Sequence, residues 1–241
     1  MNIPCLIIFK TRNQNMNTAI KYTPQNLGEV IYPSSAVERR IQAYAAGQLN
    51  GHVLLHGPNG TGKTTVANLL VNAIGGVNAR VGTRDFESFL GKPALRDFML
   101  NAAAWAGLTP GDKYFLVFNE FDYAKRGLYK FWSALDECGD AVMTIITSNN
   151  PMNIDRALRS RFDMIEFSGV SASAALQRVQ QVLRAENLVL PDAQVLYYLQ
   201  QVEHFMDVRK YLKKADELLF LRNNGIAFPA WTATKPMLKI V

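Results

Sequence analysis

The sequence predicts an α/β fold, in which a mainly parallel sheet carries helices on both faces and a small helical domain follows. Three observations predict it. Short apolar runs alternate with amphipathic helical patterns up to about residue 150. A glycine-rich turn at residues 57–62 joins the first run directly to a helix. From about residue 170 the pattern is helical, without a further strand run. Such alternation is typical of parallel sheets, because each crossover between parallel strands needs a connecting segment, usually a helix.

Apolar, β-rich runs define the expected strands, which cover residues 52–56, 113–118 and 141–147. Apolar residues three and four positions apart define the helices that cover the sheet, at residues 35–47, 64–74, 94–106 and 127–137. Ser34 or Ser35 stands where it can cap the first of them. Three further helices are expected at residues 173–185, 191–202 and 206–221. Glycine and prolines after Asn223 predict an irregular tail.

The composition favours a globular protein. The chain has 241 residues, 49% of them hydrophobic and 19% charged, which suffices for one sizeable core with a smaller one beside it and excludes general disorder. The formal net charge of +6 favours contact with nucleic acid or another acidic surface, but a merely basic, solvated surface explains it equally well. No apolar stretch reaches the roughly 20 residues of a membrane span, so we expect a soluble protein without membrane contact.

Cysteines and histidines show no metal or disulfide pattern. Cys5 and Cys138 lie far apart and outside any CxxC spacing, which fits a reducing, cytoplasmic location. His52, His56 and His204 lack the spacing of metal ligands. The apolar run at residues 3–9 lacks the basic start and the cleavage site of a signal peptide. Met16 stands just before Lys21-Tyr22-Thr23-Pro24, where the recognisable pattern begins, so residues 1–15 are an extension or the product of a mis-assigned start, and the sequence leaves both open.

The glycine-rich turn matches the pattern GxxxxGK[ST], which defines the P-loop of nucleotide-binding proteins. Its glycines allow successive backbone N–H groups to point at phosphates, and the following helix contributes the positive end of its dipole. Lys63 is expected to reach the β- and γ-phosphates, and Thr64 to supply a hydroxyl to Mg²⁺. The pattern therefore predicts ATP and Mg²⁺ as cofactors. The expected nucleotide-binding residues of this loop are Gly57, Pro58, Asn59, Gly60, Thr61, Gly62, Lys63, Thr64 and Thr65.

Polar residues follow the next two strands. The run Asn119-Glu120-Phe121-Asp122 stands where P-loop ATPases place an acidic pair near the metal. Asn119 carries no charge, so metal affinity or turnover is expected to be reduced, and Glu120 becomes the residue that polarises the attacking water. Asn149 is suited to orienting that water or the γ-phosphate. Thr64, Asn119 and Glu120 are the candidate metal ligands.

With these stretches in order, residues 20–222 resemble the AAA+ ATPases, and among them the clamp-loader branch typified by the small subunits of replication factor C. Tyr22-Thr23-Pro24 looks like the segment that lies against adenine in that family, which makes Tyr22 and Pro24 candidate nucleotide contacts. Thr147-Ser148-Asn149 looks like sensor 1. Ser160-Arg161-Phe162 is similar to the arginine-finger motif, and Met206-Asp207-Val208-Arg209 to sensor 2.

The resemblance implies a division of the chain and an assembly. It implies an N-terminal extension (residues 1–19), a P-loop ATPase domain (20–169), a three-helix lid (170–222) and a C-terminal tail (223–241). Arg161, or alternatively Arg159, would reach the γ-phosphate of a neighbouring subunit, which implies a homo- or hetero-oligomer. Arg209 would contact nucleotide from the lid. The catalytic residues implied are thus Lys63, Glu120, Asn149, Arg161 and Arg209.

Three functions remain open on the sequence. The first is an oligomeric Mg-ATPase that remodels or loads a factor on DNA, which the clamp-loader resemblance and the basic stretch after Arg209 favour. The second is an ATPase that remodels a protein partner. The third is a switch that binds ATP, orders an assembly and hydrolyses slowly because of Asn119. About twenty residues follow Leu221, too few for the collar domain of clamp loaders, so we expect a different assembly, such as a hexameric or filamentous one.

Overall fold

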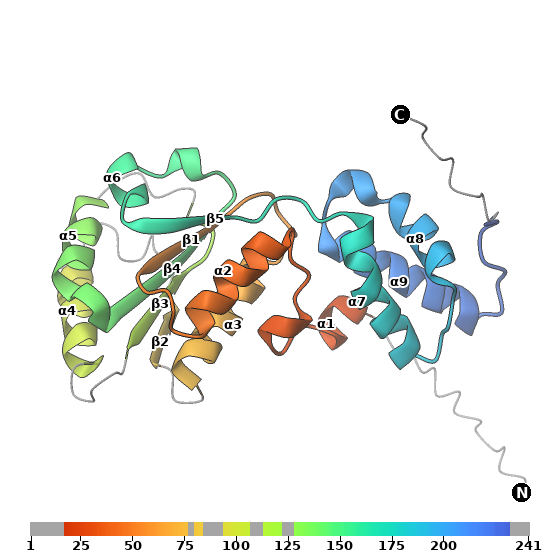
Figure 1. Ribbon diagram of the computed structural model, residues 1–241, viewed down its shortest axis with the longest axis horizontal. Coiled ribbons are helices and arrows are strands. Elements are labelled where there is room, and N and C mark those ends of the chain that lie inside the picture. Colours follow the sequence, from red (N-terminus) through yellow and green to blue (C-terminus); the bar gives the residue numbers. More distant parts are fainter. Residues whose placement is uncertain (1–16, 77–79, 84–93, 107–112, 122–127, 232–241) are drawn as a thin grey trace, which may run out of the picture.

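The computed structural model describes residues 17–76, 80–83, 94–106, 113–121 and 128–231 (Figure 1). Its sheet has five strands in the order β2-β3-β4-β1-β5, and every neighbouring pair is parallel. The strands are β1 (His52–His56), β2 (Arg80–Thr83), β3 (Tyr114–Phe118), β4 (Val142–Ser148) and β5 (Phe162–Glu166). The carboxyl ends of β1, β3 and β4 therefore meet at one edge of the sheet, where ligands bind in open α/β folds.

Helices cover both faces of this sheet. Figure 1 shows α2 (Ser35–Ala45) and α3 (Lys63–Gly75) on one side, and α4 (Ala94–Ala106) and α5 (Leu128–Cys138) on the other. Ser34 caps α2, because its hydroxyl accepts a hydrogen bond from the Val37 N–H at 3.3 Å. The short α6 (Arg156–Arg159) lies between β4 and β5 along the chain. The expected fold, a parallel sheet between two helical layers, is confirmed.

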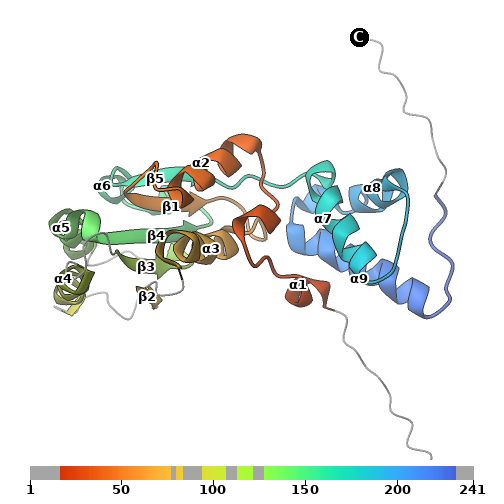
Figure 2. The same cartoon turned by 60° about the horizontal axis from the view of Figure 1, so that its bottom comes forward.

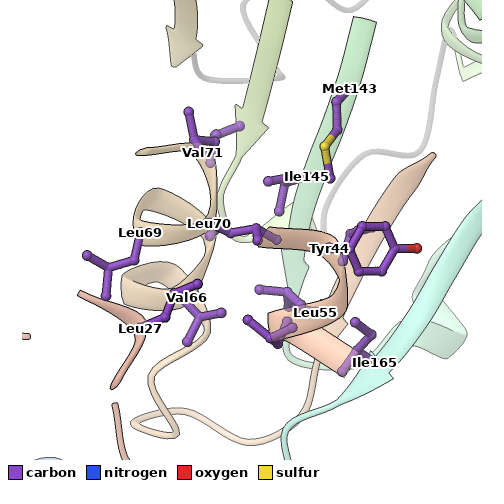
Figure 3. Packing of buried hydrophobic residues seen from close by; sticks show 14 of the residues in the cluster. Leu27, Tyr44, Leu55, Val66, Leu69, Leu70, Val71, Met143, Ile145 and Ile165 are labelled. Carbon is purple, nitrogen blue, oxygen red and sulfur yellow. The ribbon is translucent and has the colours of Figure 1, made fainter. Parts of the chain in front are cut away.

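Side chains that alternate along the strands point to opposite faces of the sheet, so the apolar core is divided into one cluster on each face. In β3, Phe115 and Val117 pack in the cluster under α2 and α3, whereas Leu116 and Phe118 pack in the cluster under α4 and α5. Figure 3 shows the first cluster, in which Leu70 of α3 lies against residues of the sheet. Successive side chains of a strand point to opposite faces, so a strand buried on both faces is mainly apolar. This explains why β3 is an unbroken apolar run and β4 a mainly apolar one, which also holds the buried Thr144, Thr147 and Ser148.

A separate three-helix unit follows the sheet, with its own apolar core. It consists of α7 (Ala172–Ala185), α8 (Asp192–Gln200) and α9 (Val208–Asn223), and we call it the lid. Ser171 caps α7 and Asp207 caps α9 through their side-chain oxygens. The helix expected from residue 206 begins at Val208, because Met206 adopts a left-handed backbone with φ of 51°. Phe228 and Trp231 of the tail pack against the lid core.

The N-terminal segment connects the lid to the sheet domain (Figures 1 and 2). Helix α1 (Thr18–Lys21) lies along α9, where the Thr18 N–H donates to Asp216 at 3.0 Å and the Thr18 hydroxyl to the Leu212 carbonyl at 3.1 Å. Only a few residues later, Leu27 is buried in the core under α2 and α3. This segment therefore contacts both units.

Some expectations fall outside the described residues, namely those on residues 1–16, on Asp122 and on residues 232–241 of the tail. Strands β2 and β5 were not expected from the sequence. Within the described ranges, no helix is long and apolar enough to cross a membrane.

Candidate nucleotide-binding site

The P-loop connects the carboxyl end of β1 to the first turn of α3. Its base is fixed by the neighbouring strands, because the Gly57 N–H donates to the Ser148 carbonyl at 3.2 Å and the Phe167 N–H donates to the His56 carbonyl at 2.7 Å. The N–H groups of the first turn of a helix have no intrahelical acceptor and carry the positive end of the dipole. The loop is therefore arranged to accept an anion at the carboxyl edge of the sheet.

Two glycines of this loop are required by space as well as by backbone conformation. A Cβ at Gly57 would lie 2.1 Å from the Phe167 carbonyl oxygen, and its φ is +139°. A Cβ at Gly60 would lie 2.0 Å from the Asp207 carboxylate, and its φ is +79°. Gly60 therefore lies directly against Asp207 at the start of α9, which means that the lid packs on the P-loop.

Lys63 is the buried cation of the site. Its side chain is held in the loop, where Nζ donates to the Gly57 and Pro58 carbonyls at 2.7 Å each, and the residue is 7% exposed. A buried ammonium interacts with an anion more strongly than an exposed one, because less water screens it. Lys63 can therefore exchange these neutral acceptors for phosphate oxygens.

The ends of β3 and β4 are joined by a hydroxyl. Thr147 is buried, and its Oγ1 accepts from the Glu120 N–H at 3.1 Å and donates to Asn119 Oδ1 at 3.3 Å. Glu120 has a φ of 54°, an unfavourable conformation for a residue with a side chain. The Thr147 hydroxyl thus supports a strained backbone that presents the Glu120 side chain, which is exposed.

These parts surround one pocket of about 380 Å³. Four parts of the chain form it: the P-loop and strand ends, the N-terminal segment, α7 and the first half of α9. Of the predicted site residues, it is lined by Tyr22, Pro24, Asn59, Gly60, Thr61, Gly62, Lys63, Thr64, Thr65, Glu120, Asn149 and Arg209. Gly57, Pro58, Asn119 and Arg161 do not line it; the first two shape the loop and Asn119 lies behind Glu120 through Thr147.

The lid contributes Arg209 to the pocket. Its guanidinium lies 3.4 Å from the Asp207 carboxylate through both Nε and Nη2, and its side chain is 64% exposed. Exposed ion pairs of this kind are weak, so Arg209 can turn toward a phosphate at little cost. The Val208 N–H donates to the Gly60 carbonyl at 3.1 Å, which places Arg209 one residue from a direct contact with the P-loop.

Comparison with protein families matches residues 53–170 to the family described as "ATPase family associated with various cellular activities (AAA)". This range runs from β1 to the end of the sheet domain and contains the P-loop and both strand ends. The chain contains an AAA domain.

Curated relatives place this AAA domain among homologues of clamp-loader subunits. The chain is 30% identical over 211 residues to the sliding-clamp-loader large subunit of Escherichia phage RB69, a match that covers 82% of this chain and 62% of the relative. The phage T4 protein of the same name is 28% identical over 210 residues and is also covered to 62%. Replication factor C small subunit 2 of Pyrobaculum arsenaticum is 25% identical over 178 residues, 71% of this chain and 54% of the relative. The chain thus spans about 62% of the length of the phage relatives.

Solved structures agree on the fold. A mutant of RuvB from Thermotoga maritima superposes with a TM-score of 0.62 at 17% identity, covering 85% of this chain and 67% of that one. Domain III of the replication initiation protein DnaA from the same organism gives 0.57 at 15% identity, covering 85% and 91%. The identity in both cases is low, so these likenesses establish the fold of the AAA domain with its lid.

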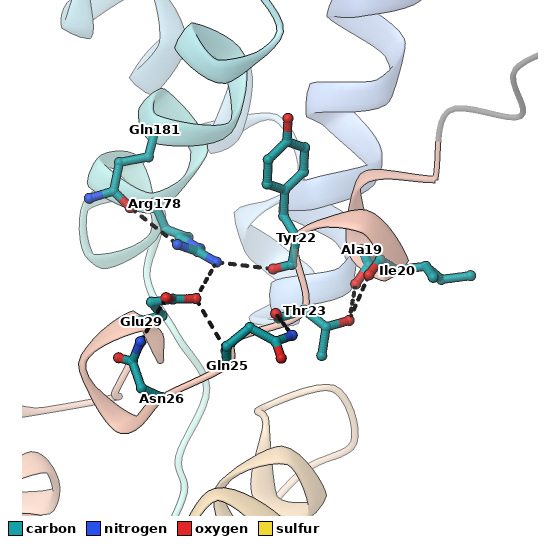
Figure 4. A network of polar contacts seen from close by, with 9 residues as sticks. All are labelled: Ala19, Ile20, Tyr22, Thr23, Gln25, Asn26, Glu29, Arg178 and Gln181. Atoms are coloured by element: carbon teal, nitrogen blue, oxygen red, sulfur yellow. Dashed lines mark hydrogen bonds and ion pairs between the residues drawn. The ribbon is translucent and has the colours of Figure 1, made fainter.

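The structure adds two charged residues to the pocket of the AAA domain that sequence reasoning missed. Arg178 of α7 and Glu29 of the N-terminal segment both line it. Figure 4 shows Arg178 between Tyr22 and Glu29, with its Nη2 3.0 Å from the Tyr22 carbonyl and 3.3 Å from Glu29 Oε2. No motif signals either residue, because they are far apart in the chain and meet only where α7 lies against the N-terminal segment.

Tyr22 is anchored to the lid by its hydroxyl. The hydroxyl donates to Glu186 Oε1 at 2.7 Å, and Lys21 Nζ reaches the same carboxylate oxygen at 2.5 Å. Burial, followed by the contact with Glu186, raises the pKa of Tyr22, and the hydrogen bonds from Lys21 and Tyr22 lower the pKa of Glu186. The phenol ring is thus directed at the lid, and the backbone of this segment and Pro24 face the pocket.

Arg161 of the AAA domain lies away from the pocket. Its guanidinium forms two hydrogen bonds to Asp136 of α5, at 2.7 and 2.5 Å, and lies 5.3 Å from the centre of the Trp132 ring. Arg159 donates to the sulfur of Met152 at 3.3 Å, and its Nε is buried without a partner among the described residues. The role of either arginine as a finger stays a prediction.

The donor set fits Mg²⁺. Thr64 and Glu120 line the pocket with oxygen ligands, and the Asn119 amide oxygen lies behind them. Mg²⁺ is usually held by one or two carboxylates together with substrate phosphates and water, and Glu120 can supply such a carboxylate at the pocket. No cluster of three or more His, Cys, Asp or Glu residues that could hold a metal ion occurs within the described ranges.

Proposed function

We propose that this chain binds Mg-ATP in the pocket and hydrolyses it within an oligomer, as an ATPase subunit that loads a sliding clamp on DNA. One observation supports it above the others: Lys63, Glu120, Asn149 and the lid residue Arg209 all line a single pocket over a P-loop. This combination supplies groups for phosphate binding, for activation of water and for a response of the lid.

Each residue has a role that follows from its position. Lys63 and the first-turn N–H groups of α3 hold the phosphates, and Thr64 offers a hydroxyl to Mg²⁺. Bound Mg²⁺ supplies charge neutralisation at the phosphate oxygens. Glu120 orients and polarises the attacking water, and Asn149 donates to that water or to the γ-phosphate. Arg209 contacts the phosphates and so couples the position of the lid to the bound nucleotide.

Arg161 is proposed to act on a neighbouring subunit. It does not line the pocket of its own chain, and its side chain is 28% exposed near the start of β5. A positive charge that arrives only on assembly would make hydrolysis depend on the oligomer. Arg159 is the alternative finger.

The DNA role rests on the relatives and on charge. The phage relatives are named sliding-clamp-loader large subunits, and the chain carries a net charge of +6. A basic surface would make DNA binding weaken steeply as salt is raised.

The test is ATP hydrolysis by the wild type and Glu120→Gln, with and without primed DNA across a salt series. We expect stimulation by primed DNA at low salt, and a loss of about 100-fold or more in kcat for Glu120→Gln while ATP still binds. Glu38→Gln, an exposed acid on α2, serves as the matched control and should leave turnover unchanged.

A slowly hydrolysing switch is the second candidate, which Asn119 favours because it removes a negative charge from the metal side of the site. Tight ATP binding without turnover under any of these conditions would support the switch and reject the motor.

A further inference from the structure

Arg178 is a partly buried charge at the edge of the nucleotide pocket that the proposed hydrolysis does not use. It comes from α7, and its side chain is 16% exposed. Its Nη2 donates to the Tyr22 carbonyl and to Glu29, and its Nη1 lies 3.3 Å from the Gln181 side-chain oxygen (Figure 4). A guanidinium held by several acceptors loses little further freedom and fixes the groups it contacts.

Glu29 extends this contact along the N-terminal segment. Its carboxylate accepts from the Gln25 N–H at 3.2 Å and from the Asn26 side chain at 2.8 Å. The hydrogen bond from the Gln25 backbone, followed by the charge of Arg178, lowers the pKa of Glu29. The Arg178–Glu29 pair therefore fixes both ends of the turn that contains Thr23 and Pro24, and these two residues line the pocket.

The wall built in this way suits the base of a nucleotide. The phosphate end of the pocket is defined by the P-loop, whereas the N-terminal segment and α9 line the pocket with the apolar residues Pro24, Val30, Ile31 and Leu212. A flat, uncharged ring fits such a surface. Arg178 is paired with the Glu29 carboxylate, so its charge is already compensated and it is poorly placed to serve as a phosphate ligand.

We propose that Arg178 is a positioning residue: it holds the turn at residues 22–29 against the nucleotide base and thereby sets the affinity for ATP. This rests on the proposed function, since it assumes that the pocket binds ATP. Arg178 belongs to the lid whereas Glu29 precedes the sheet domain, so the base wall forms only when the lid is seated. Affinity for the base thus becomes coupled to the position of the lid.

The test compares ATP with inorganic tripolyphosphate, which lacks the base. Binding of each ligand with Mg²⁺ is measured by calorimetry on the full chain, for the wild type, Arg178→Met and Arg178→Lys. We expect Arg178→Met to weaken ATP binding about tenfold, the loss of a charge-assisted contact, and to leave tripolyphosphate binding unchanged. Arg178→Lys should restore affinity in part, because one ammonium can pair with Glu29 but does not reproduce the planar fork. In ATP hydrolysis, KM should rise while kcat stays the same.

Two controls keep the result specific. Arg184→Met removes an exposed arginine from the same helix and should change neither ligand. Glu29→Gln removes the ion pair from the other side and should weaken ATP binding alone, which provides a second route if Arg178→Met does not fold.

The inference is overturned if Arg178→Met and Glu29→Gln bind ATP as tightly as the wild type. Equal losses for both ligands would also overturn it, because they would place Arg178 on the phosphates. A wild-type chain that binds neither ligand would instead refute the proposed function, and the inference with it.

Discussion

Gly169 links the sheet domain to the lid, and its replacement by alanine should unseat the lid. A Cβ at this position would lie 2.3 Å from Met206 Cβ and 2.8 Å from Met206 Cγ. Carbon atoms pack at about 3.5–4.0 Å, so more than about 1 Å of movement is required. The movement cannot be confined to the end of a flexible side chain, because the nearer atom is attached to the backbone.

The Met206 backbone is in turn fixed on both sides. Its N–H donates to the Glu203 carbonyl at 2.8 Å, and its carbonyl accepts from the Val170 N–H at 3.1 Å. Two residues later, Val208 donates to the Gly60 carbonyl of the P-loop. A shift at Met206 therefore strains the contact that seats α9 on the P-loop and displaces Arg209.

We expect Gly169→Ala to lower the free energy of unfolding by about 1–3 kcal/mol, as overpacking does. For a chain of this size, each kcal/mol lowers Tm by roughly 2–4 °C, which thermal unfolding can measure. ATP affinity should fall as well, because Arg209 no longer keeps its position relative to the P-loop. Calorimetric titration with Mg-ATP measures that second effect.

Met206→Gly, combined with Gly169→Ala, tests whether the clash with Met206 causes the loss of stability. It removes the Cβ that Gly169→Ala would strike, and glycine accepts the φ of 51° at that position without strain. The double variant should recover most of the stability lost by Gly169→Ala, so that the two changes are strongly coupled. Additive effects in the double variant, or an unchanged Tm for Gly169→Ala alone, would refute the reasoning.

Two further predictions concern the sheet. Burial lowers the pKa of His52 to about 4, whereas a histidine in the unfolded chain has a pKa of about 6.5. Between these two pH values the unfolded chain therefore binds a proton at His52 and the folded chain does not. The free energy of unfolding should therefore fall as the pH drops from 6.5 to 4, by about 3 kcal/mol, and urea unfolding of His52→Gln should lose much less over that window; parallel losses would contradict the assignment. Thr147→Val removes the hydroxyl that accepts from the Glu120 N–H, so kcat should fall by about tenfold with a smaller change in KM. Thr147→Ser keeps the hydroxyl and should retain activity, and equal kcat values for the valine variant and the wild type would show that this bond does not position Glu120.

The local part of this architecture was determined by the sequence itself. The P-loop, the strand before it and the helix after it are encoded within residues 52–75, because the glycines, Lys63 and the apolar periodicity all act over a few neighbouring positions. Strands β3 and β4 are buried on both faces, which requires apolar runs that are visible without any partner. The positions of Glu120 and Asn149 at the pocket follow from the parallel order of these strands.

Only the tertiary structure decided which distant residues complete the site. Strand β5 lies at the edge of the sheet and carries Asp163, whose carboxylate accepts from the Tyr44 hydroxyl at 2.8 Å, so its sequence does not read as a buried run. Arg178 contacts Glu29 across 149 positions of the chain, and Thr18 contacts Asp216 across 198. Such contacts depend on how the lid packs against the N-terminal segment. That packing is a property of surfaces formed after the elements exist, and no local pattern encodes it.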